Sequence, residues 1–258
     1  MTTGQFLISG WTWSAAVFLF SAAVLALYLF MFRVGRRIGY LAAALGVVLV
    51  TLISPLNALA DGYLFSAHML QHILLLLVVP ALLLLSLPRS LSLATRPRVF
   101  GHPLVGWVAG VGAMWFWHAP ALCNAAVSSR PVHALQTVSL LLLGSLFWRQ
   151  VLAPRENERL SPPGAILYLF SACVTCSALG IIITFSPVTI CSIYAMPPVD
   201  SLDMLPTIRA SWGITPERDQ QIGGLLMWVP MCLIYLSAII AQLARWFAEP
   251  VVPATETT

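Results

Sequence analysis

The sequence has very little charge. Only 9% of its 258 residues are Asp, Glu, Lys or Arg, and lysine is absent, so all thirteen basic residues are arginines. A soluble domain carries roughly 25% charged residues. The arginines are scattered through short segments and form no basic stripe, so nothing here indicates nucleic-acid binding. With 59% hydrophobic residues and a mean hydropathy of +0.89, the composition predicts an integral membrane protein.

Cysteine is also scarce. The five cysteines are odd in number and mostly lie in apolar segments: Cys123, Cys173, Cys176, Cys191 and Cys232. This pattern does not favour a disulfide framework, and we expect small buried side chains. The CxxC spacing at Cys173–Cys176 lies within an apolar run and lacks the βαβ setting of a redox motif. Were Cu(I) bound, these cysteines, Met69 and Met227 would be secondary candidate ligands.

Long apolar segments recur along the whole chain, and a bilayer-spanning helix needs about 20 such residues. No hydrophilic segment is long enough to fold alone, which favours a single domain. The first residues lack the basic region typical of a cleavable signal, so the first span is expected to be a retained signal-anchor. We therefore predict an all-α polytopic helix bundle with one domain over residues 1–258. Its spans lie near 13–32, 38–54, 63–87, 103–119, 133–152, 164–186 and 222–247.

The arginines are distributed unevenly between the two sides of this bundle. Ten flank one side, namely Arg33, Arg36, Arg37, Arg89, Arg96, Arg98, Arg149, Arg155, Arg159 and Arg245, and the other side has Arg130, Arg209 and Arg218. The positive-inside rule places the richer side in the cytoplasm. The N-terminus is then outside and the C-terminus inside. The proline-rich loop 187–221 is outside, where it either covers or binds something or is a plain surface segment.

Polar side chains converge at the outer side of the predicted bundle. Four histidines and two aspartates fall there: His68, His72, His118, His133, Asp61 and Asp219. His68 and His72 are one helical turn apart and share a helix face. Imidazole nitrogens suit copper, zinc or iron, but a hydrogen-bond network between helices is the alternative. Asp219 also fits a helix cap, and His102, on the cytoplasmic side, is expected to be a loop or cap residue.

Several motifs in this order resemble the multi-span CtaG family of cytochrome c oxidase assembly factors. They are "HMLQH" with its preceding acidic Asp61, "MWFWHAPAL", the segment from His133 to "FWRQVL", and "DQQIGGLLMWVP". The resemblance runs from about residue 50 to residue 247. It implies a bacterial inner-membrane protein of respiratory-chain biogenesis that acts on an oxidase subunit at a copper-dependent step. Carried onto this sequence, it points to the same four histidines, Asp61, and Asp219 with Gln220.

Three functions remain open at this point. The leading one is a non-enzymatic assembly factor that binds a metal, most simply copper, and delivers it to an oxidase subunit. The second is a haem-binding membrane oxidoreductase or haem carrier, because histidines on facing helices also hold haem. The third is a metal-free assembly scaffold. A small-molecule transporter is less favoured, since we see no internal repeat. The metal, its redox state, the subunit served and the oligomeric state are left open by the sequence.

Overall fold

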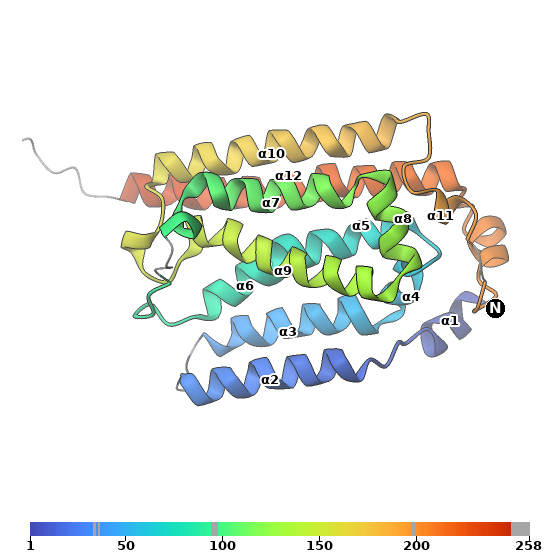
Figure 1. The fold of residues 1–258 in the computed structure, drawn as a ribbon, viewed down its shortest axis with the longest axis horizontal. Helices are drawn as coiled ribbons and strands as arrows, with labels where there is room; N and C mark the ends of the chain where they lie inside the picture. The colour runs from blue at the N-terminus through green and yellow to red at the C-terminus, as the bar shows by residue number, and fades with distance from the viewer. Residues whose placement is uncertain (33–34, 36, 94–97, 198–199, 249–258) are drawn as a thin grey trace, which may run out of the picture.

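The computed structural model describes residues 1–32, 35, 37–93, 98–197 and 200–248, and these residues form a helix bundle without strands (Figure 1). Its long elements run roughly parallel or antiparallel. They are α2 (Ala15–Met31), α3 (Ile38–Ile53), α5 (Phe65–Ile73) continuing through a π-turn (Leu74–Val78) into α6 (Val79–Ser86), α7 (Pro103–Trp117), α9 (Arg130–Leu152), α10 (Pro162–Phe185) and α12 (Pro216–Ala248).

Each of the seven predicted spans is helical. Four helices are long and apolar enough to cross a bilayer: Phe65–Ser86, Arg130–Leu152, Pro162–Phe185 and Pro216–Ala248. The other three, α2, α3 and α7, have 15 to 17 residues. At 1.5 Å per residue these three are roughly 23–26 Å long, slightly less than the roughly 30 Å of a hydrocarbon core.

Two helices begin earlier than predicted, α9 at Arg130 instead of 133 and α12 at Pro216 instead of 222. Both first turns contain a proline and polar residues. Proline suits the start of a helix, because its missing N–H is not needed there and its φ is already helical. The apolar pattern used to place spans does not detect such polar first turns.

The π-turn within the third span has a local cause. Pro80 has no N–H, so it cannot donate to the carbonyl of Leu76 four residues earlier. A π-turn at Leu74–Val78 accommodates the break. Gly144 of α9 packs directly against this carbonyl, and a Cβ at Gly144 would overlap the Leu76 oxygen. The break therefore lets α9 approach α5 and α6 closely, which brings the first turn of α9 near the histidines of α5.

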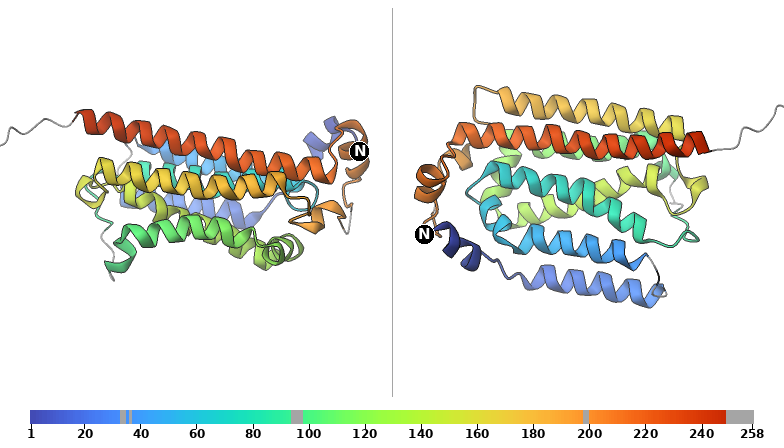
Figure 2. Two further views of the ribbon diagram at one scale, coloured as in Figure 1. Left: turned by 90° about the horizontal axis from the view of Figure 1, so that it is seen from above. Right: turned by 180° about the vertical axis from the view of Figure 1, so that it is seen from behind.

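Short helices gather at one end of the bundle. They are α1 (Thr3–Ser9), α4 (Pro55–Ala60), α8 (Pro120–Ser128) and α11 (Ser192–Ala195), and we call this the short-helix end (Figure 1). The opposite, arginine end holds the loops after α2, α6 and α9. Figure 2 shows α2 at the edge of the bundle beside α3.

Arginines at the arginine end bind backbone carbonyls of the segment that follows α6. Arg37 donates to Leu87 O at 2.6 Å, and Arg149 donates to Leu93 O at 3.1 Å. Arg37 therefore has a structural contact in addition to its predicted part in topology. Arg33, Arg36 and Arg96 lie outside the described residues.

Candidate functional site

The four histidines predicted to converge do so near the short-helix end. His68 and His72 come from α5, His118 ends α7, and His133 is in the first turns of α9. The ring centroids are 4.5 Å apart for His68–His72, 5.1 Å for His72–His118 and 5.9 Å for His68–His133. We call these four residues the histidine cluster. Its members come from three helices, so the cluster forms only when the bundle is assembled.

The two histidines of α5 are fully buried but lack hydrogen bonds. His68 is 1% exposed and His72 is 2% exposed. Neither Nδ1 nor Nε2 of either ring makes a hydrogen bond of good geometry among the described residues, although the side chain of Gln136 lies near His72. Buried polar atoms are almost always paired, because an unpaired one costs about 1–3 kcal/mol. Four such nitrogens side by side are free to accept or donate to a ligand placed between the rings.

His118 places a ring nitrogen against a sulfur atom. Its Nδ1 lies 2.5 Å from the carbonyl oxygen of Met114, and its Nε2 lies 3.0 Å from the sulfur of Met69. A carbonyl only accepts, so Nδ1 carries the proton of the neutral ring. The Nε2 lone pair then faces a thioether, which is itself an acceptor. Two facing lone pairs repel each other, whereas a soft cation would bind both.

The cluster is not yet arranged around one ion. Among the described residues, no three His, Cys, Asp or Glu side chains converge as a metal site. The rings instead contact one another edge-on or tilted. Because the nitrogens of His68 and His72 make no hydrogen bonds, these rings can rotate without breaking one.

Asp61 holds His133 in place. Its Oδ1 lies 3.4 Å from Nδ1 of His133, and its Oδ2 accepts from the amide of Asn57 at 2.9 Å. Burial raises the pKa of Asp61, although the nearby His133 and the Asn57 hydrogen bond act in the opposite direction. A carboxylate behind a histidine ring is the arrangement that orients metal-binding histidines. In the structure Asp61 is therefore placed behind a candidate ligand.

Asp219 already has a full set of partners. Its Oδ2 accepts from the backbone N–H of Phe65 at 2.6 Å, and its Oδ1 accepts from the N–H and the hydroxyl of Ser66 at 3.0 and 2.5 Å. The carboxylate thus caps the N-terminus of α5, which carries "HMLQH", from the first turn of α12. The sequence suggested that Asp219 caps its own helix, α12, but in the structure it caps α5. Its use as a metal ligand stays a prediction.

Gln220 anchors the segment after α10. Its Oε1 accepts from Ile190 N at 2.8 Å, and its Nε2 lies within 3.1–3.4 Å of the carbonyl oxygens of Ile183, Ser186 and Val188. The "DQQ" motif therefore fixes one helix start and one loop. It positions the elements around the histidine cluster.

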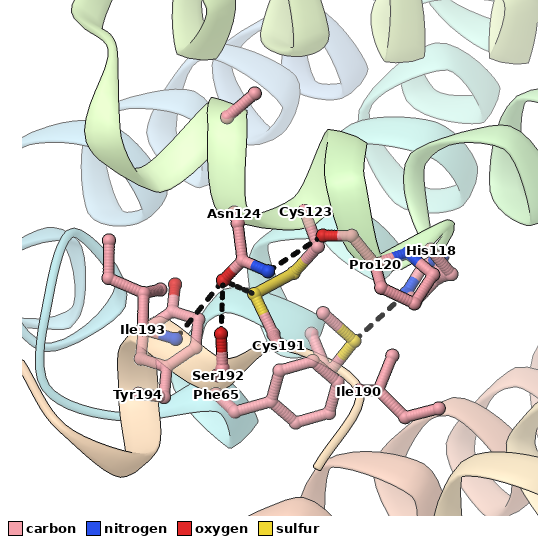
Figure 3. Close-up of a disulfide and its surroundings, with 12 residues drawn as sticks. Phe65, His118, Pro120, Cys123, Asn124, Ile190, Cys191, Ser192, Ile193 and Tyr194 are labelled. Carbon is pink, nitrogen blue, oxygen red and sulfur yellow. Dashed lines mark hydrogen bonds between the residues drawn. A yellow bond between two sulfur atoms is a disulfide. The ribbon is translucent and has the colours of Figure 1, made fainter.

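A disulfide fastens the loop between α10 and α12 beside the cluster. Cys123 of α8 is bonded to Cys191, next to α11 (Figure 3). Asn124 supports this contact, because its Oδ1 accepts from Ile193 N at 3.1 Å. Tyr194 of α11 is buried, with its ring 6.0 Å from His68, and its hydroxyl donates to Ala60 O at 2.5 Å. Part of the 187–221 loop thus covers the site.

The expectation that the cysteines form no disulfide was wrong for one pair. Cys123 and Cys191 are the two cysteines predicted outside the apolar spans or at their outer margin, and disulfides persist in oxidising compartments. That position was the signal that could have revealed the pair. Tyr194 carried no detectable signal, because its contact with His68 depends on how the loop folds. The packing prediction holds for Cys176, which is 1% exposed.

His102 behaves as predicted. It is the N-cap of α7, and its Nδ1 accepts from Leu104 N at 3.2 Å. It precedes α7, whose first residues lie at the arginine end of the bundle (Figure 1).

Comparisons with known proteins identify the family of the chain. The family described as cytochrome c oxidase caa3 assembly factor (Caa3_CtaG) matches residues 19–249. An uncharacterized protein of Mycobacterium leprae (strain TN) is 23% identical over 237 residues, which is 83% of this chain and 34% of that protein. An uncharacterized protein of Mycobacterium bovis is 24% identical over 238 residues, with the same shares. The chain spans about a third of the length of these relatives. No solved structure matches.

Proposed function

The chain belongs to the family of cytochrome c oxidase caa3 assembly factors, and we propose that it carries copper in the histidine cluster and passes it to an oxidase subunit. Copper is the cargo in this proposal. The protein holds it through nitrogen and sulfur ligands and changes no covalent bond. Its partners are then the bilayer and the subunit that receives the metal.

The contact between His118 and Met69 carries the proposal. Nε2 of His118 lies 3.0 Å from a thioether sulfur that is 0% exposed, and the adjacent His72 has two unpaired nitrogens. Thioether and imidazole together suit Cu(I), which prefers soft ligands, better than they suit zinc or magnesium. His68 and His133 would complete the set, with Asp61 and Asp219 positioning the ligands.

Delivery by this route is ligand exchange. The cargo must leave near the short-helix end, because the cluster lies there, and α11 with Tyr194 covers it. Oxidase subunits that receive copper would therefore contact this cover. A cover held by one disulfide and a few hydrogen bonds can shift without unfolding the bundle.

The membrane arrangement that accompanies this function has seven crossings, with the N-terminus outside and the C-terminus in the cytoplasm of a bacterial inner membrane. Three observations support it. Seven apolar helices are present, four of them of full spanning length. The described arginines of the richer set, such as Arg37, Arg149 and Arg155, lie at one end. The disulfide lies at the other end, as expected for an oxidising compartment.

Metal per polypeptide in single variants tests the proposal. The purified protein should contain copper by elemental analysis, and His72→Ala and His118→Ala should each lose most of it. Membrane abundance should be retained, because His72 has no hydrogen bond to lose and an interhelical polar contact such as that of His118 with Met69 is worth only about 0.6 kcal/mol. His102→Ala, at the arginine end, is the matched control and should keep the metal. Unchanged metal in both cluster variants would refute the site.

The same preparation separates the alternatives. A haem carrier would show a Soret band, and a scaffold would retain no stoichiometric metal. The ring contacts favour a bare ion over haem, because centroids 4.5–5.9 Å apart leave no room for a porphyrin among the rings.

A further inference from the structure

A cavity of about 700 Å³ lies between α2, α3 and α9, and His133, whose ring is 5.9 Å from that of His68, is part of its lining. Most of its wall is apolar, including Val17, Phe20 and Leu141. The volume falls within the roughly 300–1,000 Å³ of small-molecule sites.

The polar groups of this cavity are collected at one end. Asn57, Asp61, Arg130 and His133 line the part next to the short-helix end. Farther along α9 the lining becomes apolar at Leu141. Leu141 is eleven residues after Arg130, which corresponds to about 16 Å along the helix. We call the part lined by Asn57, Asp61, Arg130 and His133 the mouth, and the apolar remainder the body. The body is about as deep as a short hydrocarbon chain is long.

The cavity opens toward the side of the bundle that faces lipid. Three of its lining side chains are exposed: Trp13 at 76%, Phe20 at 49% and Val138 at 51%. Exposed apolar residues along a membrane helix face the acyl chains. A molecule dissolved in the bilayer can therefore enter sideways, tail first into the body.

The mouth of the cavity offers both hydrogen-bond donors and acceptors. Among the described residues Arg130 has no hydrogen bond, although its charge attracts that of Asp61, so its donors are available. Asp61 supplies carboxylate oxygens, one of them held by Asn57. A guanidinium binds phosphate or carbonyl oxygens, and a carboxylate accepts from an ammonium or a hydroxyl.

We propose that this cavity binds one membrane amphiphile, with a hydrogen-bonding head at Arg130, His133 and Asp61 and a hydrocarbon tail along Val17, Phe20 and Leu141. Two molecules share this chemistry, a bilayer phospholipid and a prenyl quinone. The site is separate from copper binding, although His133 borders both. An occupied mouth would fix His133.

The test fills the cavity and leaves the cluster unchanged. Ala134 lines the cavity beside His133, and Ala134→Phe would narrow the cavity just inside its mouth. Its neighbour Leu135 is 62% exposed and lies outside the lining, so Leu135→Phe is the matched control. Phospholipid and quinone are extracted from each purified protein and counted per polypeptide by mass spectrometry. We expect one tightly held molecule in the native protein and in the control, and at least a fivefold loss in Ala134→Phe.

Two further arms identify the source and the head contacts. Incubation with a decyl-tailed benzoquinone displaces a bound quinone, whereas vesicles of phosphatidylglycerol and phosphatidylethanolamine exchange a bound phospholipid. Arg130→Gln, on an exposed residue, should lower retention of the same molecule fivefold even if Ala134→Phe fails to fold. Equal retention in Arg130→Gln and the native protein, or no stoichiometric amphiphile in the native protein, overturns the proposal. Copper content is measured in parallel, so loss of the amphiphile with copper retained separates this site from the metal site.

Discussion

Replacement of Asp219 by asparagine tests how the histidine helix is held. The carboxylate is 1% exposed and accepts three hydrogen bonds from Phe65 and Ser66 at the start of α5. Asparagine keeps the shape but replaces one acceptor oxygen with an NH₂ group that faces donors. At least one hydrogen bond to a charged group, worth about 1.5–3 kcal/mol, is lost. We expect a loss of about 2–4 kcal/mol in stability, because the remaining bonds also lose their charge.

The assay is thermal unfolding of the metal-free protein in detergent. A change of 1 kcal/mol shifts the Tm of a chain of this size by about 2–4 °C, so Asp219→Asn should lower Tm by roughly 4–16 °C. Metal affinity should also fall, by about 10–100-fold, as for other residues that orient ligands. The control is Glu217→Gln, an exposed carboxylate in the same helical turn. It should change neither quantity.

Two results would refute this reasoning in different ways. An unchanged Tm in the metal-free protein would show that the three hydrogen bonds do not hold α5. If metal were then lost while Tm stayed constant, Asp219 would be acting as a ligand. The measurement on metal-free protein therefore separates positioning from ligation, which metal content alone cannot do.

Two other predictions concern packing and the cover. A Cβ at Gly224 would overlap Thr184 of α10, so Gly224→Ala should lower the stability by about 1–3 kcal/mol through overpacking. Gly46 has nothing within 4 Å, so Gly46→Ala is the control and should be neutral or slightly stabilising. Thermal unfolding of both variants tests this, and an equal Tm would contradict the close α10–α12 contact. When the denatured but unreduced protein is treated with an alkylating reagent, three of its five cysteines should be modified, because Cys123 and Cys191 are bonded. Five modified cysteines by mass spectrometry would disprove the disulfide.

The sequence predicted the helices well because hydropathy reports them directly. All seven apolar segments are helical, with boundaries displaced only where proline and polar residues open a helix, as at Arg130 and Pro216. The short helices α1, α4, α8 and α11 were not predicted. They lie at the short-helix end, where they pack through mixed polar and apolar contacts, and such contacts leave no periodic pattern in the sequence.

The site was predicted in part for a similar reason. The positions of the histidines along their spans, together with the alternation of helix direction, were enough to bring His68, His72, His118 and His133 to one depth. The contact of His118 with Met69 depends on how α7 rotates against α5, and composition does not encode that rotation. Likewise Asp219 lies next to α5 only because α12 packs against it through Gly223, where a Cβ would come within 2.5 Å of Phe65.

The unpaired ring nitrogens of His68 and His72 raise the question of why a helix bundle would contain these two histidines. In a scaffold, the imidazoles would have been placed to bond one another or a neighbouring helix, because lipid offers no other partner. In the structure Asp219 is fully paired, whereas both rings of α5 make no hydrogen bond and Gln71 is paired through its Nε2 but not through its Oε1. Each unpaired group costs about 1–3 kcal/mol, a cost that a leucine at the same position would avoid. Retaining them in a packed, covered pocket is consistent with a site whose last partner arrives from outside the chain.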